Sequence, residues 1–196
     1  NSAPFLSSSG SSKVLVFDAN ARIIAEPTNF GVAFRDLYGA MLTYTPNKTV
    51  SRVDVAARRV YFTDNTSEYG DVLNIIPNQT AGAIVQASYL DNAATPAGGR
   101  FAGVDVLSYE STAQAGVHVI GDSSSTTQPK AGHVANQEAK VCADAIIRLF
   151  LDVPLDPAPV TNSACYSPIT FEIASWLSVV YQYDPVSKTM RPAPNA

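Results

Sequence analysis

The strongest folding signal in the chain is an apolar run that ends in a glycine and an acid and precedes a long amphipathic segment. The run is Val117–Ile120, the pair is Gly121–Asp122, and the segment spans residues 132–151. Apolar residues recur at helical spacing along that segment, at Val134, Val141, Ala145 and Leu149, with Cys142 and Ile146 beside them. We therefore expect a buried strand over 117–122, a polar loop over 123–127 and a long helix from about 132 to 151.

Strand and helix patterns alternate through the rest of the chain. The sequence predicts a buried strand over 13–18, a helix over 32–42, a β-hairpin from 53–55 and 59–62, a buried strand over 72–77 and a short helix over 80–90. A proline-rich linker over 154–159 precedes short strands in the final stretch. This alternation is typical of an α/β fold with a parallel sheet. Yet no predicted strand is followed by the Gly-x-Gly-x-x-Gly turn with which dinucleotide-binding folds normally begin.

Composition limits the possible functions. Of the 196 residues, 46% are apolar and 15% are charged, so the chain is expected to fold. The net charge of −4 offers no basic field for nucleic acid, and no apolar run approaches the roughly 20 residues that span a bilayer. Two cysteines, Cys142 and Cys165, exclude a disulfide framework and a cysteine-rich zinc site, and we predict no metal. The Cys-x-x-Cys-His motif of covalently attached haem is absent.

The glycine and acid after the predicted strand form a candidate ligand site. Gly121 would let the backbone approach a ligand closely, and Asp122 could accept hydrogen bonds from sugar-like hydroxyls. The helix that begins near Gly132 would point its positive end at the same crevice, which suits an atom that gains negative charge, such as the edge of a reduced flavin. The alternative is a structural turn in which Asp122 only caps the loop, and spacing alone favours neither.

Five motifs in order resemble one family, the flavoprotein subunit of flavocytochrome c sulfide dehydrogenase, which is similar to the pyridine nucleotide-disulfide reductases. The resemblance runs from about residue 12 to about 185. The motifs are Ser12–Asn20, Asn74–Gly82, Val104–Asp105 with Tyr109–Ser111, Gly116–Asp122 with Pro129–Val141, and Cys165–Ser167.

The resemblance implies only the C-terminal part of a flavoprotein with two dinucleotide-binding, Rossmann-like domains for FAD and NAD(P). Residues 1–70 would be the later part of the second, NAD-like nucleotide domain, and 71–153 the C-terminal segment of the FAD-binding domain. Residues 154–196 would begin a C-terminal flavin-binding and interface domain. The glycine-rich FAD turn would lie in an upstream segment of the family, which explains why this sequence lacks it.

The same resemblance implies a set of flavin-binding residues. Asp122 would bind the ribityl chain, and Gly121 would allow the approach. Lys130 and Ala131 would lie near the isoalloxazine ring. Pro77 and Gln79 would border the active site, in a loop where this sequence departs from the family at Asn78 and Thr80. Phe101–Gly103 also departs from the family pattern, and these departures bear on the substrate more than on the flavin.

Cys165 is the candidate catalytic residue. The resemblance implies that it pairs with an upstream cysteine in a redox-active disulfide beside the flavin, where a thiolate can attack sulfur. The alternative is a small buried hydrophobe. Cys142 lies on the predicted helix face, and we interpret it as a core residue. His118, within the apolar run, is interpreted as a hydrogen-bonded core histidine.

The function implied by the resemblance is oxidation of a small inorganic sulfur substrate at a Cys165–FAD site. Electrons would then pass to haem on a separate cytochrome c subunit in the periplasm. One alternative is a flavin oxidoreductase with another acceptor, such as a quinone. A non-enzymatic alternative is a flavin-free binding or interface module. A visible absorption spectrum would distinguish the enzyme from the module.

Overall fold

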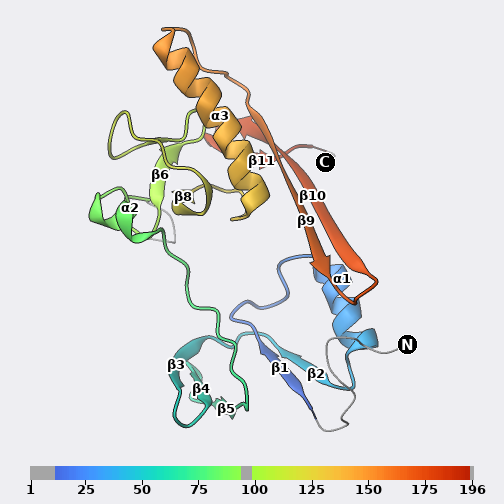
Figure 1. Ribbon diagram of the computed structural model, residues 1–196. Helices are drawn as coiled ribbons and strands as arrows, with labels where there is room; N and C mark the ends of the chain where they lie inside the picture. Colours follow the sequence, from blue (N-terminus) through green and yellow to red (C-terminus); the bar gives the residue numbers. More distant parts are fainter. Residues whose placement is uncertain (1–11, 94–98, 195–196) are drawn as a thin grey trace. The chain divides into compact units, whose positions relative to one another are not determined.

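The computed structural model describes residues 12–93 and 99–194 (Figure 1). The chain divides into two compact units. Unit 1 comprises Asn1–Pro77 with Tyr166–Trp176, and unit 2 comprises Asn78–Cys165 with Leu177–Ala196. The tip of the hairpin formed by β9 (Val160–Pro168) and β10 (Ala174–Asp184) therefore groups with unit 1, while the remainder of that hairpin belongs to unit 2.

Unit 1 contains a parallel strand pair joined through a helical crossover. Strand β1 (Val14–Phe17) pairs with β2 (Leu42–Thr45), and helix α1 (Pro27–Val32) with the π-helical turn η1 (Ala33–Leu37) lies between them in the chain. The strand predicted at 13–18 is confirmed. The helix predicted over 32–42 starts earlier, because Pro27 suits the first helical turn, and it ends at Leu37.

A three-stranded antiparallel sheet forms the other part of unit 1. It consists of β3 (Val50–Asp54), β4 (Arg59–Phe62) and β5 (Ser67–Tyr69), and it confirms the predicted hairpin. Val60 and Phe62 are buried, and the Phe62 ring lies 4.7 Å from that of Phe17 on β1. Apolar and aromatic contacts thus join this sheet to the parallel pair.

The strand predicted over 72–77 is wrong. The segment has no regular structure, and none of its residues pairs with a described strand. Val72 and Ile76 are 87% and 83% exposed, so this apolar run is not buried against the described residues. An apolar run becomes a strand only where a neighbouring strand satisfies its backbone groups, and here no such partner is present among them.

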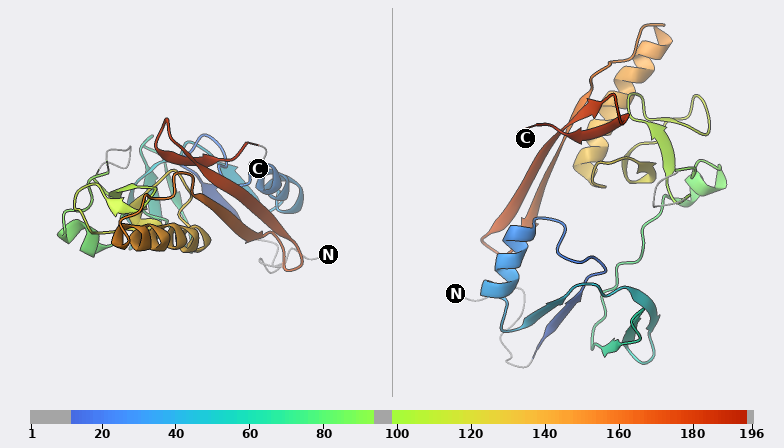
Figure 2. Two further views of the ribbon diagram at one scale, coloured as in Figure 1. Left: turned by 90° about the horizontal axis from the view of Figure 1, so that it is seen from above. Right: turned by 180° about the vertical axis from the view of Figure 1, so that it is seen from behind.

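Unit 2 is built around β6 (Ala102–Asp105), which lies between antiparallel β7 (Glu110–Ser111) and parallel β8 (Ser124–Ser125). Helix α2 (Ala83–Ala87) lies beside β6 in Figure 1 and in both views of Figure 2, and it is shorter than the predicted helix over 80–90. The core that joins them contains Ala81, Val85, Leu90, Ala93, Phe101, Ala102 and Val119.

The predicted buried strand over 117–122 is also wrong as a continuous strand. It makes a single bridge, between His118 and Glu110, and it ends in the 3-10 turn η2 (Gly121–Ser123). Glycines with positive φ bound the run on both sides, Gly116 at +76° and Gly121 at +67°, so the chain turns before a ladder can form. Val119 nevertheless packs into the core.

The long helix is confirmed as α3 (Gly132–Phe150). Its buried residues are Val134, Glu138, Cys142 and Ala145, whereas the predicted face had Val141 and Leu149 in place of Glu138. The last turn extends beyond the packed part of the helix, because Ile147, Leu149 and Phe150 are all exposed. Within residues 12–93 and 99–194, no helix is both long and apolar enough to cross a bilayer.

The C-terminal strands are longer than predicted. Strands β9 (Val160–Pro168), β10 (Ala174–Asp184) and β11 (Thr189–Pro192) form a sheet of order β11–β10–β9. The proline-rich segment before β9 has no regular structure, as expected of a linker. The chain is thus a mixed α/β protein with several sheets, and most of its strand pairs are antiparallel, whereas the sequence predicted a parallel sheet beside one hairpin.

Candidate functional site

The turn formed by Gly121–Ser124, which we call the Gly121 turn, lies against helix α3. Gly121 has a φ of +67°, and a Cβ at this position would lie 3.1 Å from the Cβ of Ala135. The Gly121 backbone N–H donates to Oε2 of Glu138 at 2.5 Å, and Ser124 Oγ donates back to the Gly121 carbonyl at 2.8 Å. Backbone conformation and close helix contact both require glycine here.

Lys130 holds the same turn from its carbonyl side. Its Nζ donates to the backbone oxygens of Asp122 at 2.9 Å and of Ser124 at 2.7 Å. The ammonium also lies 4.0 Å from the centre of the Phe101 ring. Loss of hydration lowers the pKa of Lys130, and the nearby acids Asp122 and Glu138 oppose that shift.

Glu138 is a site residue that sequence reasoning missed. It is 1% exposed, and burial raises its pKa despite the opposing hydrogen bond from Gly121 and the charge of Lys130. Thr126 Oγ1 donates to its other oxygen at 3.4 Å. The available signal was its position, four residues after Val134 and four before Cys142, which places an acid on the buried stripe of the helix.

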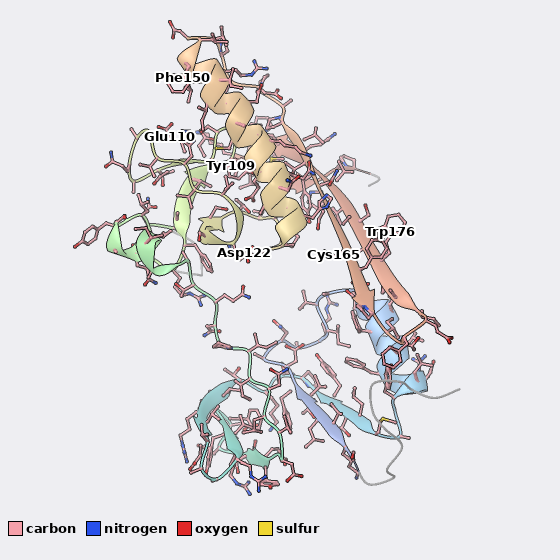
Figure 3. All side chains as sticks on the ribbon, in the orientation of Figure 1. Tyr109, Glu110, Asp122, Phe150, Cys165 and Trp176 are labelled. Atoms are coloured by element: carbon pink, nitrogen blue, oxygen red, sulfur yellow. The ribbon has the colours of Figure 1, made fainter. Side chains whose placement is uncertain are left out.

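The Asp122 side chain is exposed near the N-terminal end of α3, as Figure 3 shows. That end has no side-chain cap: the N-cap residue is Ala131, and the first turn contains no acid. The free N–H groups of the first turn therefore retain their partial positive charge. The structure thus places Gly121, Asp122, Lys130 and Ala131 around the Gly121 turn and the start of α3.

Cys165 lies on β9 in the same unit. Its thiol is half-buried and free, and Sγ lies 3.9 Å from Ser163 Oγ. Residues two apart on a strand share a face, so Cys165 follows the buried hydroxyls of Thr161 and Ser163. Burial raises the pKa of Tyr181, and the charge of a Cys165 thiolate adds to this shift.

Two hydrogen bonds place β9 beside the start of α3. His133 Nε2, in the first turn of the helix, lies 2.5 Å from Asn162 Oδ1, and Gln128 Nε2 donates to Thr161 Oγ1 at 2.7 Å. Cys165 is three residues beyond Asn162, or about 10 Å along an extended strand.

The predicted loop residues Pro77 and Gln79 are both exposed. Pro77 is the last residue of the first segment of unit 1, whereas Gln79 belongs to unit 2. The Gln79 carbonyl accepts a hydrogen bond from Arg100 at 3.2 Å, and Thr80 Oγ1 donates to the Arg100 carbonyl. Pro77 and the Gly121 turn thus belong to different units.

The other two residues considered from the sequence, Cys142 and His118, have contacts that fit a structural role. Cys142 is 7% exposed, which confirms its interpretation as a core residue, and burial raises the pKa of its thiol. His118 Nδ1 lies 2.9 Å from the Ser108 carbonyl, as expected of a hydrogen-bonded histidine. Among the residues that the structure describes, no three His, Cys, Asp or Glu side chains cluster as a metal site.

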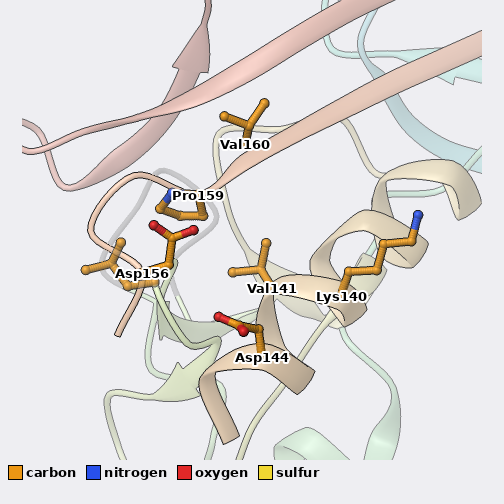
Figure 4. A pocket seen from close by; sticks show the side chains of 7 residues that line it. Lys140, Val141, Asp144, Asp156, Pro159 and Val160 are labelled. Carbon is orange, nitrogen blue, oxygen red and sulfur yellow. The ribbon is translucent and has the colours of Figure 1, made fainter. Parts of the chain in front are cut away.

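A pocket of about 180 Å³ opens elsewhere in unit 2 (Figure 4). It is smaller than the roughly 300 Å³ at which ordinary ligand pockets begin. None of the predicted site residues lines it. The lining residues are Leu107, Lys140, Val141, Asp144, Asp156, Pro159 and Val160.

The first part of the chain is similar to one protein family. Residues 3–77 match the family model for the central part of the flavoprotein chain of sulfide dehydrogenase, a flavocytochrome c. The resemblance predicted from the sequence is confirmed. The Gly121 turn and Cys165 lie outside the matched residues, so their roles depend on the geometry and the motifs described above.

Two solved structures share the fold. One is a chain of the mitochondrial ATP synthase of Tetrahymena thermophila, with a TM-score of 0.64 and 13% identity over 88% of this chain and 42% of that one. The other is the sulfide:quinone oxidoreductase of Aquifex aeolicus, with a TM-score of 0.60 and 13% identity over 92% of this chain and 45% of that one. The chain spans less than half the length of either.

Proposed function

We propose that this chain is the flavin- and cysteine-bearing part of an FAD-dependent sulfide dehydrogenase. The observation that carries the proposal is the Gly121 turn, which Glu138 and Lys130 hold beside an uncapped helix end. The match of residues 3–77 to a sulfide dehydrogenase flavoprotein supports the same class of reaction.

The residues present fit a flavin. The uncapped first turn of α3 suits the edge of the ring system that becomes negative on reduction. Asp122 is exposed beside it and is free to accept hydrogen bonds from ribityl hydroxyls, while Gly121 lets the backbone approach. Lys130 and Ala131 would border the ring, and Pro77 and Gln79 would lie in the loop that borders the active site.

Cys165 would receive the sulfur substrate. Oxidation of hydrosulfide to zero-valent sulfur removes two electrons and one proton. A bound flavin supplies the acceptor for the electron pair and can release the electrons one at a time to haem iron. Before each turnover Cys165 would form a disulfide with an upstream cysteine. Hydrosulfide would attack that disulfide, so that a persulfide forms on one cysteine and the other leaves as a thiolate. Re-formation of the disulfide would release zero-valent sulfur and a proton and pass two electrons to the bound flavin.

The rest of the proposal concerns organisation. Residues 1–70 would complete a second nucleotide domain, 71–153 would return to the FAD domain, and 154–196 would begin the interface domain. The partner would be a cytochrome c-type subunit in the periplasm. The match to the flavoprotein chain of a flavocytochrome c supports the cytochrome partner.

The test is a spectrum followed by a reduction assay on the full-length protein. Flavin absorption bands that bleach when sulfide is added without oxygen are expected. Cytochrome c and a soluble quinone are then offered separately as acceptors, with two cytochrome haems reduced per sulfide. Bleaching with transfer to quinone alone would favour the sulfide:quinone class instead. A colourless full-length protein that takes up no FAD would contradict the proposal and favour a flavin-free module.

A further inference from the structure

Glu138 occupies an unusual position for an acid. It lies in the middle of α3 at 1% exposure, on the stripe that otherwise contains Val134, Cys142 and Ala145. A buried carboxyl group is costly unless each oxygen has a hydrogen-bond donor. Both oxygens have one here, since Oε2 accepts from the Gly121 N–H and Oε1 accepts from Thr126 Oγ1.

The Gly121 turn is therefore held from two sides, by a hydrogen-bond acceptor on one side and a hydrogen-bond donor on the other. Glu138 accepts the N–H at the start of the turn, and Lys130 donates to the carbonyls of Asp122 and Ser124. Glu138 also accepts from Thr126, just beyond the turn, and the Lys130 ammonium lies over the Phe101 ring. The turn determines where the Asp122 backbone and carboxylate lie relative to the end of α3.

A second glutamate makes the same kind of bond elsewhere in unit 2. Glu110 Oε1 accepts the N–H of Gly116 at 2.6 Å, and Gly116 also has a positive φ. Glu110 is half-buried, however, and a Cβ on Gly116 would meet nothing within 4 Å. The Gly116 turn thus reproduces the bond without the contact to α3, and it provides a matched control.

We propose that Glu138 is a positioning residue of the flavin site, which fixes the Gly121 turn against α3 so that Asp122 reaches the cofactor. The inference rests on the proposed function and deepens it. Glu138 acts through the turn and touches neither substrate nor cofactor. Its acceptor oxygens, rather than its charge, perform this role, so glutamine is expected to substitute for it.

The experiment measures FAD affinity by fluorescence in the full-length protein after removal of its flavin. Glu138→Leu is expected to weaken FAD binding by on the order of tenfold or more, because it leaves the Gly121 N–H unpaired. Glu138→Gln keeps an acceptor and is expected to stay within about threefold of the wild type. Glu110→Leu is expected to leave the affinity unchanged.

A second readout needs no flavin. Backbone hydrogen exchange of the peptide that covers 119–126 is expected to accelerate in Glu138→Leu and not in Glu110→Leu. If Glu138→Leu does not fold, Glu138→Asp replaces it, since the shorter side chain withdraws the oxygens by roughly 1.5 Å while the acid remains. That variant is expected to show both changes in weaker form.

The outcomes separate the two proposals. A wild-type protein that binds no FAD contradicts the proposed function. If the wild-type protein binds FAD and the Glu138→Leu and Glu110→Leu variants have equal affinity for it, the proposed role of Glu138 is overturned while the proposed function stands. Failure of Glu138→Gln to preserve the affinity, with normal exchange in 119–126, would likewise overturn it.

Discussion

Cys142 and Cys165 lie in the same unit but in opposite environments. Cys142 is in the middle of α3, buried against the core, and burial raises the pKa of its thiol. Cys165 is half-buried on β9, and its Sγ lies 3.9 Å from the hydroxyl of Ser163. Residue type alone therefore does not make a thiol reactive. Its reactivity depends on solvent access to the sulfur and on how easily the thiolate forms.

The largest expected effect separates the two thiols by activity. Cys165→Ser in the full-length protein should lower sulfide-dependent flavin reduction by at least on the order of a hundredfold, because a hydroxyl cannot replace the thiolate. Cys142→Ser should retain most of the rate per folded molecule. Anaerobic stopped-flow measurement of flavin bleaching checks both variants. Equal losses in the two would remove the functional distinction between the cysteines.

The rate of alkylation compares the reactivity of the same two thiols directly. After reduction with dithiothreitol, iodoacetamide should modify Cys165 faster than Cys142 by on the order of tenfold or more, since Cys142 is buried. Peptide mass spectrometry over a time course measures the ratio. In denaturant the ratio should approach one, and a native ratio near one would show that the packing of Cys142 does not protect it.

The two serine variants should rank in the opposite order when the free energy of unfolding is measured. Cys142→Ser places a hydroxyl in an apolar site and is expected to cost about 1–2 kcal/mol. Cys165→Ser is expected to cost less than about 0.5 kcal/mol, because Ser163 can still pair with a hydroxyl there. Urea denaturation of both variants measures the difference. A larger loss for Cys165→Ser would identify that residue as the core cysteine.

The smallest effect concerns pH. Because the folded-state pKa of Cys142 lies above its unfolded value, the thiol contributes stability below the unfolded pKa and loses it as pH rises through the folded pKa. The wild type should therefore lose stability relative to Cys142→Ala above about pH 8.5, with a slope below about 1.4 kcal/mol per pH unit. Urea midpoints between pH 7 and 10 measure this, and parallel curves would contradict it.

The sequence predicted those parts of the fold that depend on local pattern. Helix α3 has a long amphipathic repeat, and the β3–β4 hairpin has two close strands, so both were found. The runs over 72–77 and 117–122 were mispredicted because apolar content does not reveal whether a partner strand exists. Whether a strand pairs with a distant segment depends on tertiary contacts, which a short window of sequence does not contain.

The candidate site shows the same division. Gly121, Asp122 and Lys130 could be found because they follow one another closely around a turn. Glu138 was missed although its spacing from Val134 and Cys142 places it on the buried stripe, because an acid on a helix is ordinarily assigned to the solvent face. Only the burial of its carboxyl and the N–H of Gly121 reveal the contact.

The alternation of β9 has one further consequence. Thr161, Ser163 and Cys165 share a face because the strand repeats every two residues, so an insertion of a single residue after Asn162 would carry the thiol to the opposite side of the sheet. An insertion of two would restore its direction and only shift it along the strand. The face of the sheet on which the thiol lies, and with it the reactivity of the thiol, therefore depends on whether the number of residues before it on the strand is odd or even.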